Sequence, residues 1–327
     1  MRPAYSLYDT AYYFSYERRL TTRFFFSQKF TSLTIKDQAS KYNLTYSPNT
    51  TLNMGIGATY KSFTLNLAYG FGFLNPDVGK GKTRYLDLQF HNYGRKVVLD
   101  VLGQFYSGFY TSLNGTGPPS DRYYLRPDLR VNEIGVSAQY VLNNRKFSYR
   151  ASFLQDEWQK KSSGTILVGF EAYGGWVRAD SAIVPTAIGG EASFNNPRKF
   201  NFFEFGPNVG YAHTLIIKKH FFFTASGSVS LDYGVSTLTN NERTHQSVGF
   251  SPNTFLRFFC GYNSSRWAIS AVYVRNSVRL ASDNAPQIIL NTGNIRLNYV
   301  HRFRLGRKGR KALKVVDDAE KAIGASP

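Results

Sequence analysis

The residues of this sequence that could do chemistry are isolated histidines and charged side chains, and they form no catalytic motif. Neither the GxSxG nucleophile elbow nor the HExxH zinc helix occurs in the chain. Asp87 and His91 share one face of a predicted strand, but the strand rise separates them by about 13 Å, too far for a hydrogen bond. A base such as His91 would need a partner from a neighbouring strand. We therefore expect no catalytic residue, no metal site and no cofactor.

Long stretches alternate apolar residues with small or polar ones, which predicts β-strands whose two faces meet different surroundings. The clearest case is KSFTLNLAYGFGF (61–73), where the apolar series runs from Phe63 to Phe73 and Ser, Thr, Asn, Ala and Gly fill the alternate positions. Strands of globular proteins have about 5–6 residues, whereas a tilted membrane strand needs about 9–11. Many predicted strands here reach the longer range: 22–37, 42–59, 61–73, 95–109, 131–143, 163–177, 201–217, 219–234 and 288–304.

Tight turns and longer polar loops separate these segments, as in bacterial outer-membrane barrels. We predict tight turns at Tyr60-Lys61, Tyr93-Gly94, Asn143-Asn144, Lys218-Lys219 and Asn263-Ser264. We predict loops at 74–82, 110–130, 178–200, 235–245 and 277–287. The segments number about 13, and closed bacterial barrels have an even number of strands. Either a short strand within 181–194 completes 14, or the N-terminal segment lies outside the barrel and leaves 12.

Composition favours lipid around the sheet. Aromatic residues make up 16% of the chain and crowd predicted strand ends, as at Phe24-Phe25-Phe26 and Phe221-Phe222-Phe223. The mean hydropathy is −0.33, and we find no apolar run of the about 18 residues that a spanning helix needs. The net charge of +19 is spread along the chain, which fits lipid headgroups better than a nucleic-acid groove. Strands that face hydrocarbon must pair all their backbone groups, so we expect the sheet to close on itself.

The alternation also predicts which charged and polar side chains face the lumen. Charges of both signs inside a barrel can form an ion-paired plug, or they can line a polar channel, and the sequence leaves both open. The predicted lumen-lining residues are Asp87, Gln89, His91, Asp100, Arg150, Glu171, Glu204, Asp232, Arg257 and Arg296.

Four stretches resemble a Bacteroidetes outer-membrane family known as domain of unknown function 4421. They are SPNTTLNMGIGATYKSFTLNLAYGFGFLNPDVGKGKTRYLDLQFHNYGRK (47–96), RYYLRPDLR (122–130), FSYRASFLQDEWQKKSSG (147–164) and FFEFGPNVGYAHTL (202–215). The resemblance spans about residues 9–304. It implies a barrel in the outer membrane and implies no reaction.

We therefore predict an all-β protein, a transmembrane antiparallel up-and-down barrel of about 12–14 strands in the bacterial outer membrane. Residues 1–20 form an N-terminal segment or first strand, 21–304 the barrel, and 305–327 a basic amphipathic tail. The tail spacing predicts a short periplasmic helix over 308–324.

Three functions remain open. The first is a porin-like or transport and binding barrel for a small solute, with lipids and no nucleic acid as partners. The second is a structural or assembly component that docks a periplasmic or envelope protein through 308–324. The third, of lowest weight, is a lipid-modifying membrane enzyme.

Overall fold

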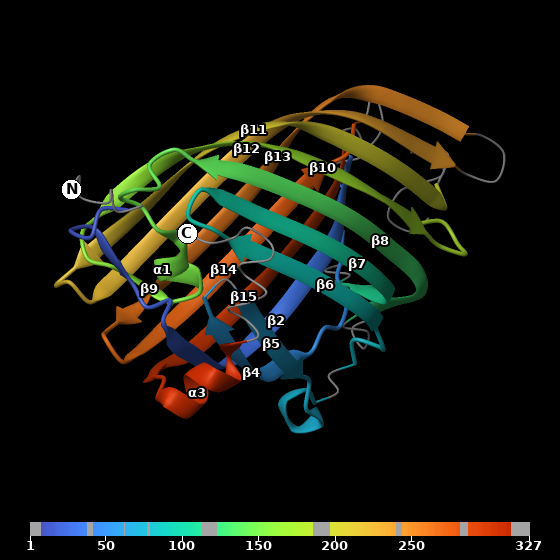
Figure 1. Ribbon diagram of the computed structural model, residues 1–327. Helices are drawn as coiled ribbons and strands as arrows, with labels where there is room; N and C mark the ends of the chain where they lie inside the picture. Colours follow the sequence, from blue (N-terminus) through green and yellow to red (C-terminus); the bar gives the residue numbers. More distant parts are fainter. Residues whose placement is uncertain are drawn as a thin grey trace.

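One large antiparallel sheet dominates the computed structural model, which describes residues 8–37, 42–61, 63–76, 79–112, 123–185, 197–239, 244–281 and 287–314 (Figure 1). The strands are β1 (Tyr13–Ser15), β2 (Arg19–Asp37), β3 (Tyr42–Tyr46), β4 (Leu52–Tyr60), β5 (Phe63–Tyr69), β6 (Arg84–Tyr93), β7 (Val97–Thr111), β8 (Tyr124–Val141), β9 (Glu157–Gln159), β10 (Ser163–Arg178), β11 (Lys199–Ile217), β12 (Phe221–Thr239), β13 (Thr244–Asn263), β14 (Trp267–Arg279) and β15 (Gln287–Arg304). The helical elements are η1 (Gly72–Leu74), α1 (Tyr149–Phe153) and α3 (Arg307–Ala312). No helix among these described residues is long and apolar enough to cross a membrane.

Strands that follow one another in the chain pair side by side, and the sheet curls. Its order is β5-β4-β2-β15-β14-β13-β12-β11-β10-β8-β7-β6. β3 lies beside this path and pairs with the C-terminal end of β2. The pairing of β15 with β2, from Arg304↔Arg19 to Gln287↔Lys36, joins the end of the chain to its beginning. This path contains 12 strands, so the alternative in which the N-terminal segment stays outside the barrel describes this sheet.

As predicted, one face of the sheet is apolar and the other is largely polar, and the apolar face points outward. On β12, Phe221, Val229 and Leu231 are 51%, 53% and 56% exposed. The Ser and Thr residues between them, such as Thr224 and Ser226, are buried inside the curl. A soluble sheet would bury the apolar series instead.

The expected closure of the sheet does not occur in the described strands. β5 and β6 are consecutive in the chain, yet they form the two edges of the sheet and no ladder joins them. Figure 1 shows the two strands facing each other across this seam. η1 and the loop around it separate the strands, and they lead the chain from one edge to the other.

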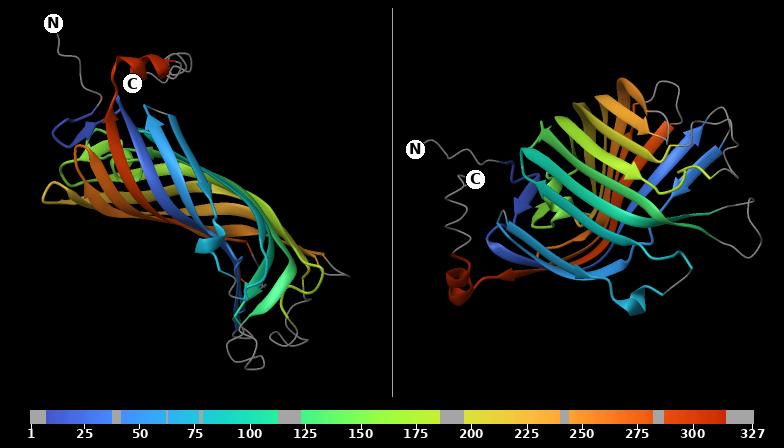
Figure 2. Two further views of the ribbon diagram at one scale, coloured as in Figure 1. Left: turned by 90° about the horizontal axis from the view of Figure 1, so that it is seen from below. Right: turned by 90° about the vertical axis from the view of Figure 1, so that its right-hand side faces the viewer.

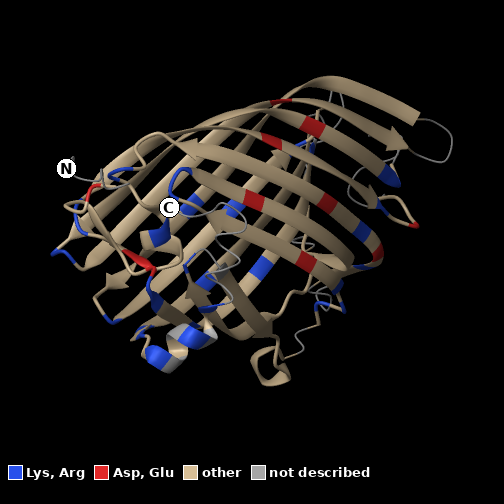
Figure 3. Ribbon diagram, viewed as in Figure 1, with Lys and Arg blue, Asp and Glu red and all other residues tan. Residues whose placement is uncertain are grey.

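One end of the curled sheet carries the short turns, and we call it the turn end. Lys61, Lys218 and Lys219 adopt positive φ there, as tight turns require. β1 also lies at this end (Figure 2), and we call the opposite end of the sheet the loop end. α3 follows β15 at the turn end, where many Lys and Arg residues gather (Figure 3).

Several predicted boundaries were wrong. The loops predicted at 110–130 and 235–245 contain strand, because β8 begins at Tyr124 and β12 and β13 extend to Thr239 and from Thr244. The predicted strand 42–59 is two strands, β3 and β4. Residues 181–185 form no strand, and residues 186–194, which belong to the same expected strand, lie outside the described residues. Most of the predicted helix 308–324 also lies outside them, although α3 lies within the described part.

The segment between β8 and β10 is the largest departure from the predicted pattern. The turn predicted at Asn143-Asn144 is present, within the turn residues 142–146. Residues 145–153 alternate like a strand, but α1 and then β9 follow the turn instead. Ser148 caps α1 by accepting a hydrogen bond from the Ala151 amide (3.1 Å). The segment enters the turn end of the lumen, where the Tyr149 hydroxyl donates to Ser226 on β12 (2.6 Å). We call α1 and β9 the plug.

The plug is tied to the N-terminal segment outside the large sheet. β1 pairs with β9 from Tyr13↔Gln159 to Ser15↔Glu157. Arg95, in the β6–β7 turn, donates to Glu157 (3.2 Å) and to Glu17 (3.1 Å). Burial raises the pKa of Glu157 above its ordinary value, against the opposing attraction of Arg150 and Arg95.

Buried side chains pack both ends of the lumen. At the loop end, Tyr46 and Leu33 belong to a buried apolar cluster that includes Ile183, whose carbonyl accepts a hydrogen bond from the Tyr46 hydroxyl (2.6 Å). At the turn end, a second cluster packs Phe147 and Tyr149 of the plug segment against strand residues. Polar and charged residues occupy the middle, and Figure 3 shows the acidic ones along the strands between the two ends.

Candidate functional site

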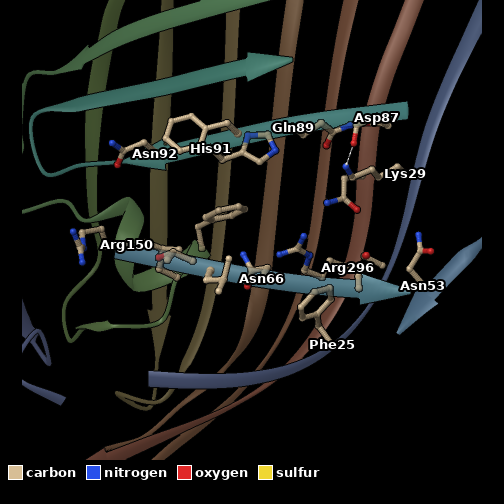
Figure 4. A pocket seen from close by; sticks show the side chains of 18 of the residues that line it. Phe25, Lys29, Asn53, Asn66, Asp87, Gln89, His91, Asn92, Arg150 and Arg296 are labelled. Atoms are coloured by element: carbon tan, nitrogen blue, oxygen red, sulfur yellow. Dashed lines mark hydrogen bonds and ion pairs between the residues drawn. The ribbon is translucent and has the colours of Figure 1, made fainter. Parts of the chain in front are cut away.

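The seam between β5 and β6 opens into a cavity of about 530 Å³ (Figure 4). We call this cavity with its two bordering strands, Phe63–Tyr69 and Arg84–Tyr93, the window. Inner-face side chains of β5, such as Asn66, are exposed because no strand covers them. Side chains from β2, β6, β15 and α1 complete the lining, including Lys29, Asp87, His91, Arg150 and Arg296.

Hydrogen bonds between the β3–β4 connection and the start of β6 limit the window at the loop end. The Thr51 and Tyr85 hydroxyls lie 2.7 Å apart, and the Asn49 amide donates to the Thr83 hydroxyl (2.8 Å). A β-bridge between Ser47 and Tyr110 lies on the same side. These contacts therefore join the two sides of the seam where the cavity ends toward the loop end.

The plug limits the window at the turn end. Arg150 donates to the carbonyl of Lys61 at the β4–β5 turn (2.7 Å) and forms an ion pair with Asp156. On the other side of the plug, the Leu154 carbonyl accepts a hydrogen bond from Arg23 of β2 (3.2 Å). Phe153 packs edge-on against His91 of β6, with ring centroids 5.6 Å apart. The plug thus contacts both sides of the seam.

One ion pair crosses the window itself. Lys29 of β2 donates to the Asp87 carbonyl (2.7 Å) and to its carboxylate (3.2 Å), and Figure 4 shows this contact across the cavity. Asp87 also accepts hydrogen bonds from Tyr106 (2.6 Å) and Gln104 (3.2 Å). The charges of Lys29 and Asp87 therefore compensate each other.

His91 contacts a carboxylate on the neighbouring strand, which its own strand could not provide. Its Nδ1 lies 2.5 Å from the Asp100 carboxylate on β7. Asp100 also accepts from Tyr93 (3.0 Å) and pairs with Arg257 of β13 (2.6 Å). Arg257 is fully buried and donates to Gln139 (3.2 Å). Asp100 thus fixes the orientation of a histidine that lines the window.

Arg296 is the cation of the window that lacks an anion. Its guanidinium lies 4.5 Å from the centroid of the Phe25 ring, and its Nε is buried with no hydrogen-bond partner. Within the described residues, no carboxylate lies within ion-pair distance of Arg296 or of nearby Arg23. Arg23 donates to the Thr59 hydroxyl (2.6 Å) and the Asn66 amide oxygen (3.4 Å), both neutral. These two guanidinium groups leave uncompensated positive charge behind β5.

The remaining predicted lumen residues lie deeper in the barrel, away from the window lining. Asn208 donates to Glu171 (2.8 Å), and Asn253 donates to Glu204 (2.5 Å) and to Asp232 (2.7 Å). No Lys or Arg of the described chain lies within ion-pair distance of these three carboxylates. Of the ten predicted residues, the structure places five at the window: Asp87, Gln89, His91, Arg150 and Arg296.

The sequence prediction missed two cations at this site and misassigned a third. Arg23 and Lys29 share the inner face of β2, but the apolar run at Phe24–Phe26 hid the alternation there. Arg150 was expected on a strand and lies instead on α1. The partner of His91 comes from a β6–β7 pairing, His91↔Asp100, whose register alternation alone does not give.

The outer face beside the window is grooved. A cavity of about 690 Å³ runs over β15, β2, β4 and β5, with Ala58 at its floor and Phe24, Ile56, Leu67 and Tyr299 among its apolar walls. Leu65 of β5 lines both this groove and the window cavity. The two spaces therefore meet at the unpaired edge strand.

Fold and site together define a curled antiparallel sheet with an apolar outer face, a lumen packed with side chains at both ends and a lateral window. The chain belongs to the family described as "Domain of unknown function (DUF4421)", whose model matches residues 7–303. No curated protein is detectably similar to it.

Solved structures with a similar arrangement are outer-membrane proteins of low identity. The Escherichia coli outer membrane protease OmpT is 8% identical with a TM-score of 0.39, over 87% of this chain and 97% of that chain. The outer-membrane protein OmpT of Vibrio cholerae is 9% identical with a TM-score of 0.29, over 87% and 98%. The Pseudomonas putida toluene transporter TodX is 8% identical with a TM-score of 0.24, over 88% and 91%. These likenesses are too distant to indicate a function.

Proposed function

We propose that this protein is an outer-membrane barrel that binds a small ligand in the window, and that it does not act as an open diffusion pore. One observation carries the proposal: the cavity around the unpaired Arg296 opens sideways between β5 and β6, while buried side chains pack both ends of the lumen. A ligand would therefore enter through the wall of the barrel.

The membrane part of the proposal rests on the outer face. Exposed large apolar residues occur on nearly every long strand, as at Leu67, Ile134, Val209 and Phe250. A soluble monomer rarely exposes a continuous apolar surface of this extent. Between the two apolar clusters, the inner face carries buried polar and charged residues, as in membrane barrels with polar interiors.

Conductance in planar bilayers tests whether the lumen is filled. We expect no steady conductance above the bare membrane, while a general porin in the same bilayers conducts. A stable open channel in the purified protein would contradict a sideways binding site as the route for solute.

Disulfide trapping tests the window directly, in a Cys260→Ser background because Cys260 is an exposed free thiol. Leu67→Cys is combined in turn with Leu86→Cys, Leu88→Cys and Phe90→Cys across the seam. Leu67→Cys with Ile56→Cys is the matched control, because these residues are direct partners on β4 and β5. We expect oxidation to join the control pair rapidly and the three seam pairs slowly. Equal rates would show that the sheet closes in the membrane and would remove the window.

We propose binding and not catalysis at His91. Asp100 orients the imidazole as in many general bases, but no hydroxyl or thiol among the described residues hydrogen-bonds to it. Lipid hydrolysis by wild type that is lost in His91→Ala would overturn this assignment.

A second role at the turn end is suggested by α3, which carries the exposed Arg307 and Lys311 beyond the last strand. We propose that this basic extension docks an acidic envelope protein. Deletion of 306–327 should remove partners that co-purify with the barrel while the barrel still folds; unchanged co-purification would exclude the role.

A further inference from the structure

We propose that the window binds an anionic single-chain amphiphile, with its charged headgroup against Arg296 and its acyl chain in the outer groove over β4. This inference rests on the proposed function and adds the chemical class of the ligand. It follows from three features that meet at β5.

The first feature is the charge. Lys29 and Arg150, the other cations of the window, have carboxylate partners in Asp87 and Asp156. Arg296 has none among the described residues, its Nε is buried without a partner, and Arg23 adds a second positive charge nearby. Arg296 is half-buried at the cavity wall, and a carboxylate or phosphate bound to its guanidinium by two parallel hydrogen bonds would supply the missing anion.

The second feature is the edge of the sheet. One side of β5 and one side of β6 carry backbone N–H and C=O groups with no ladder partner. Hydrocarbon cannot satisfy these groups, so this seam needs water or a polar ligand. A wholly apolar ligand would leave them unpaired, whereas a polar headgroup and its water would not.

The third feature is the continuity with the groove. Leu65 lines both spaces, so a molecule anchored at Arg296 can continue over β5 onto the outer face. Ala58 lowers the floor of the groove between the larger side chains of Phe24, Ile56 and Leu67. A channel of this shape accommodates an acyl chain, and its position on the lipid-facing surface gives the chain access from the bilayer.

Displacement of dansyl-labelled undecanoate from the detergent-solubilised full chain tests the proposal. Hexadecanoate and hexadecyl phosphate should both displace the probe, and their order of affinity tells which headgroup the site prefers. Hexadecanol lacks the charge and should displace at least about tenfold more weakly, since a charge-assisted hydrogen bond contributes about that factor. Acetate keeps the charge but lacks the chain, and it should also displace at least about tenfold more weakly because each buried CH₂ group contributes about 0.8 kcal/mol. Equal displacement by hexadecanol and hexadecanoate would overturn the anionic assignment.

Variants locate the two halves of the ligand. Arg296→Gln should weaken hexadecanoate binding by about tenfold or more, and Arg296→Lys should restore part of it. Arg304→Gln, on the exposed end of the same strand, is the matched control. Ala58→Phe should fill the groove and weaken hexadecanoate binding, while Val229→Phe on a distant part of the outer face should not. Circular dichroism melts verify that each variant is folded.

One further variant separates failure of the ligand class from failure of the window. Asn66→Trp fills the window from β5. If Asn66→Trp abolishes probe binding but Arg296→Gln does not affect it, the window binds the probe without recognition of its charge by Arg296, and the anionic assignment is wrong. If neither variant affects probe binding, the window itself is not the site and the proposed function falls with it.

Discussion

Among the described residues, some buried carboxyl groups of this protein have a cationic partner and others have none. The contribution of each carboxyl group to the stability of the fold therefore depends on its partners. Asp100 contacts His91, Tyr93 and the fully buried Arg257. Glu133 is equally buried, but neither of its carboxyl oxygens has a hydrogen-bond partner. The same chemical change at the two positions should therefore have very different results.

We predict that Asp100→Asn destabilises the folded barrel by about 3–5 kcal/mol, because it leaves Arg257 buried without an anion. Glu133→Gln is the matched control, since it changes an acid to an amide on the same face; it should change the free energy of unfolding by less than about 1 kcal/mol. Urea titration in lipid vesicles, followed by tryptophan fluorescence, measures both. Equal destabilisation by the two variants would mean that the Asp100–Arg257 pair has no special role.

At the scale of single elements, the long strands could be predicted and the plug could not. Apolar alternation located β12 as 219–234, close to Phe221–Thr239, because its two faces meet lipid and a polar interior. In 145–153, Phe147 and Ala151 are four residues apart, and so are Tyr149 and Phe153. A spacing of four residues places two side chains on the same face of a strand and also on the same face of a helix. The same residues therefore suit a strand or a short helix, and contacts with β12 and β13 inside the lumen decide.

The plug offers a test at this scale through Ser148, which caps α1 and donates to Glu157 (2.5 Å). Ser148→Ala removes both bonds, and loss of a helix cap costs about 1 kcal/mol or more. We expect the Ala151 amide to exchange its hydrogen at least about fivefold faster, measured by hydrogen–deuterium exchange with mass spectrometry. Ser265→Ala in an exposed turn should leave exchange in α1 unchanged. Unaltered exchange in Ser148→Ala would show that packing alone holds α1.

At the scale of the whole molecule, the sequence predicted which face is apolar and that consecutive strands pair, but not that β5 and β6 stay apart. Alternation gives each strand an inner and an outer side, and it does so equally well for a closed or an open sheet. The seam depends on how the segment around η1 carries the chain from β5 to β6, and on the plug, which links both edges at one end. The window and its unpaired Arg296 therefore emerge only from the assembled structure.

The apolar outer face predicts a dependence on depth in the bilayer that no soluble sheet would show. Val229 and Phe221 lie on the same face of β12 and are 53% and 51% exposed, but Val229 is near the middle of the strand and Phe221 begins it. Val229→Arg places a charge in hydrocarbon and should destabilise the folded protein in vesicles by about 2–4 kcal/mol. Phe221→Arg places the charge at the interface and should destabilise the folded protein by about 0–1 kcal/mol. Urea unfolding in vesicles of fixed lipid composition measures both variants. In water, two positions of equal exposure would tolerate arginine equally, so equal effects would place this face against solvent or protein and not against acyl chains.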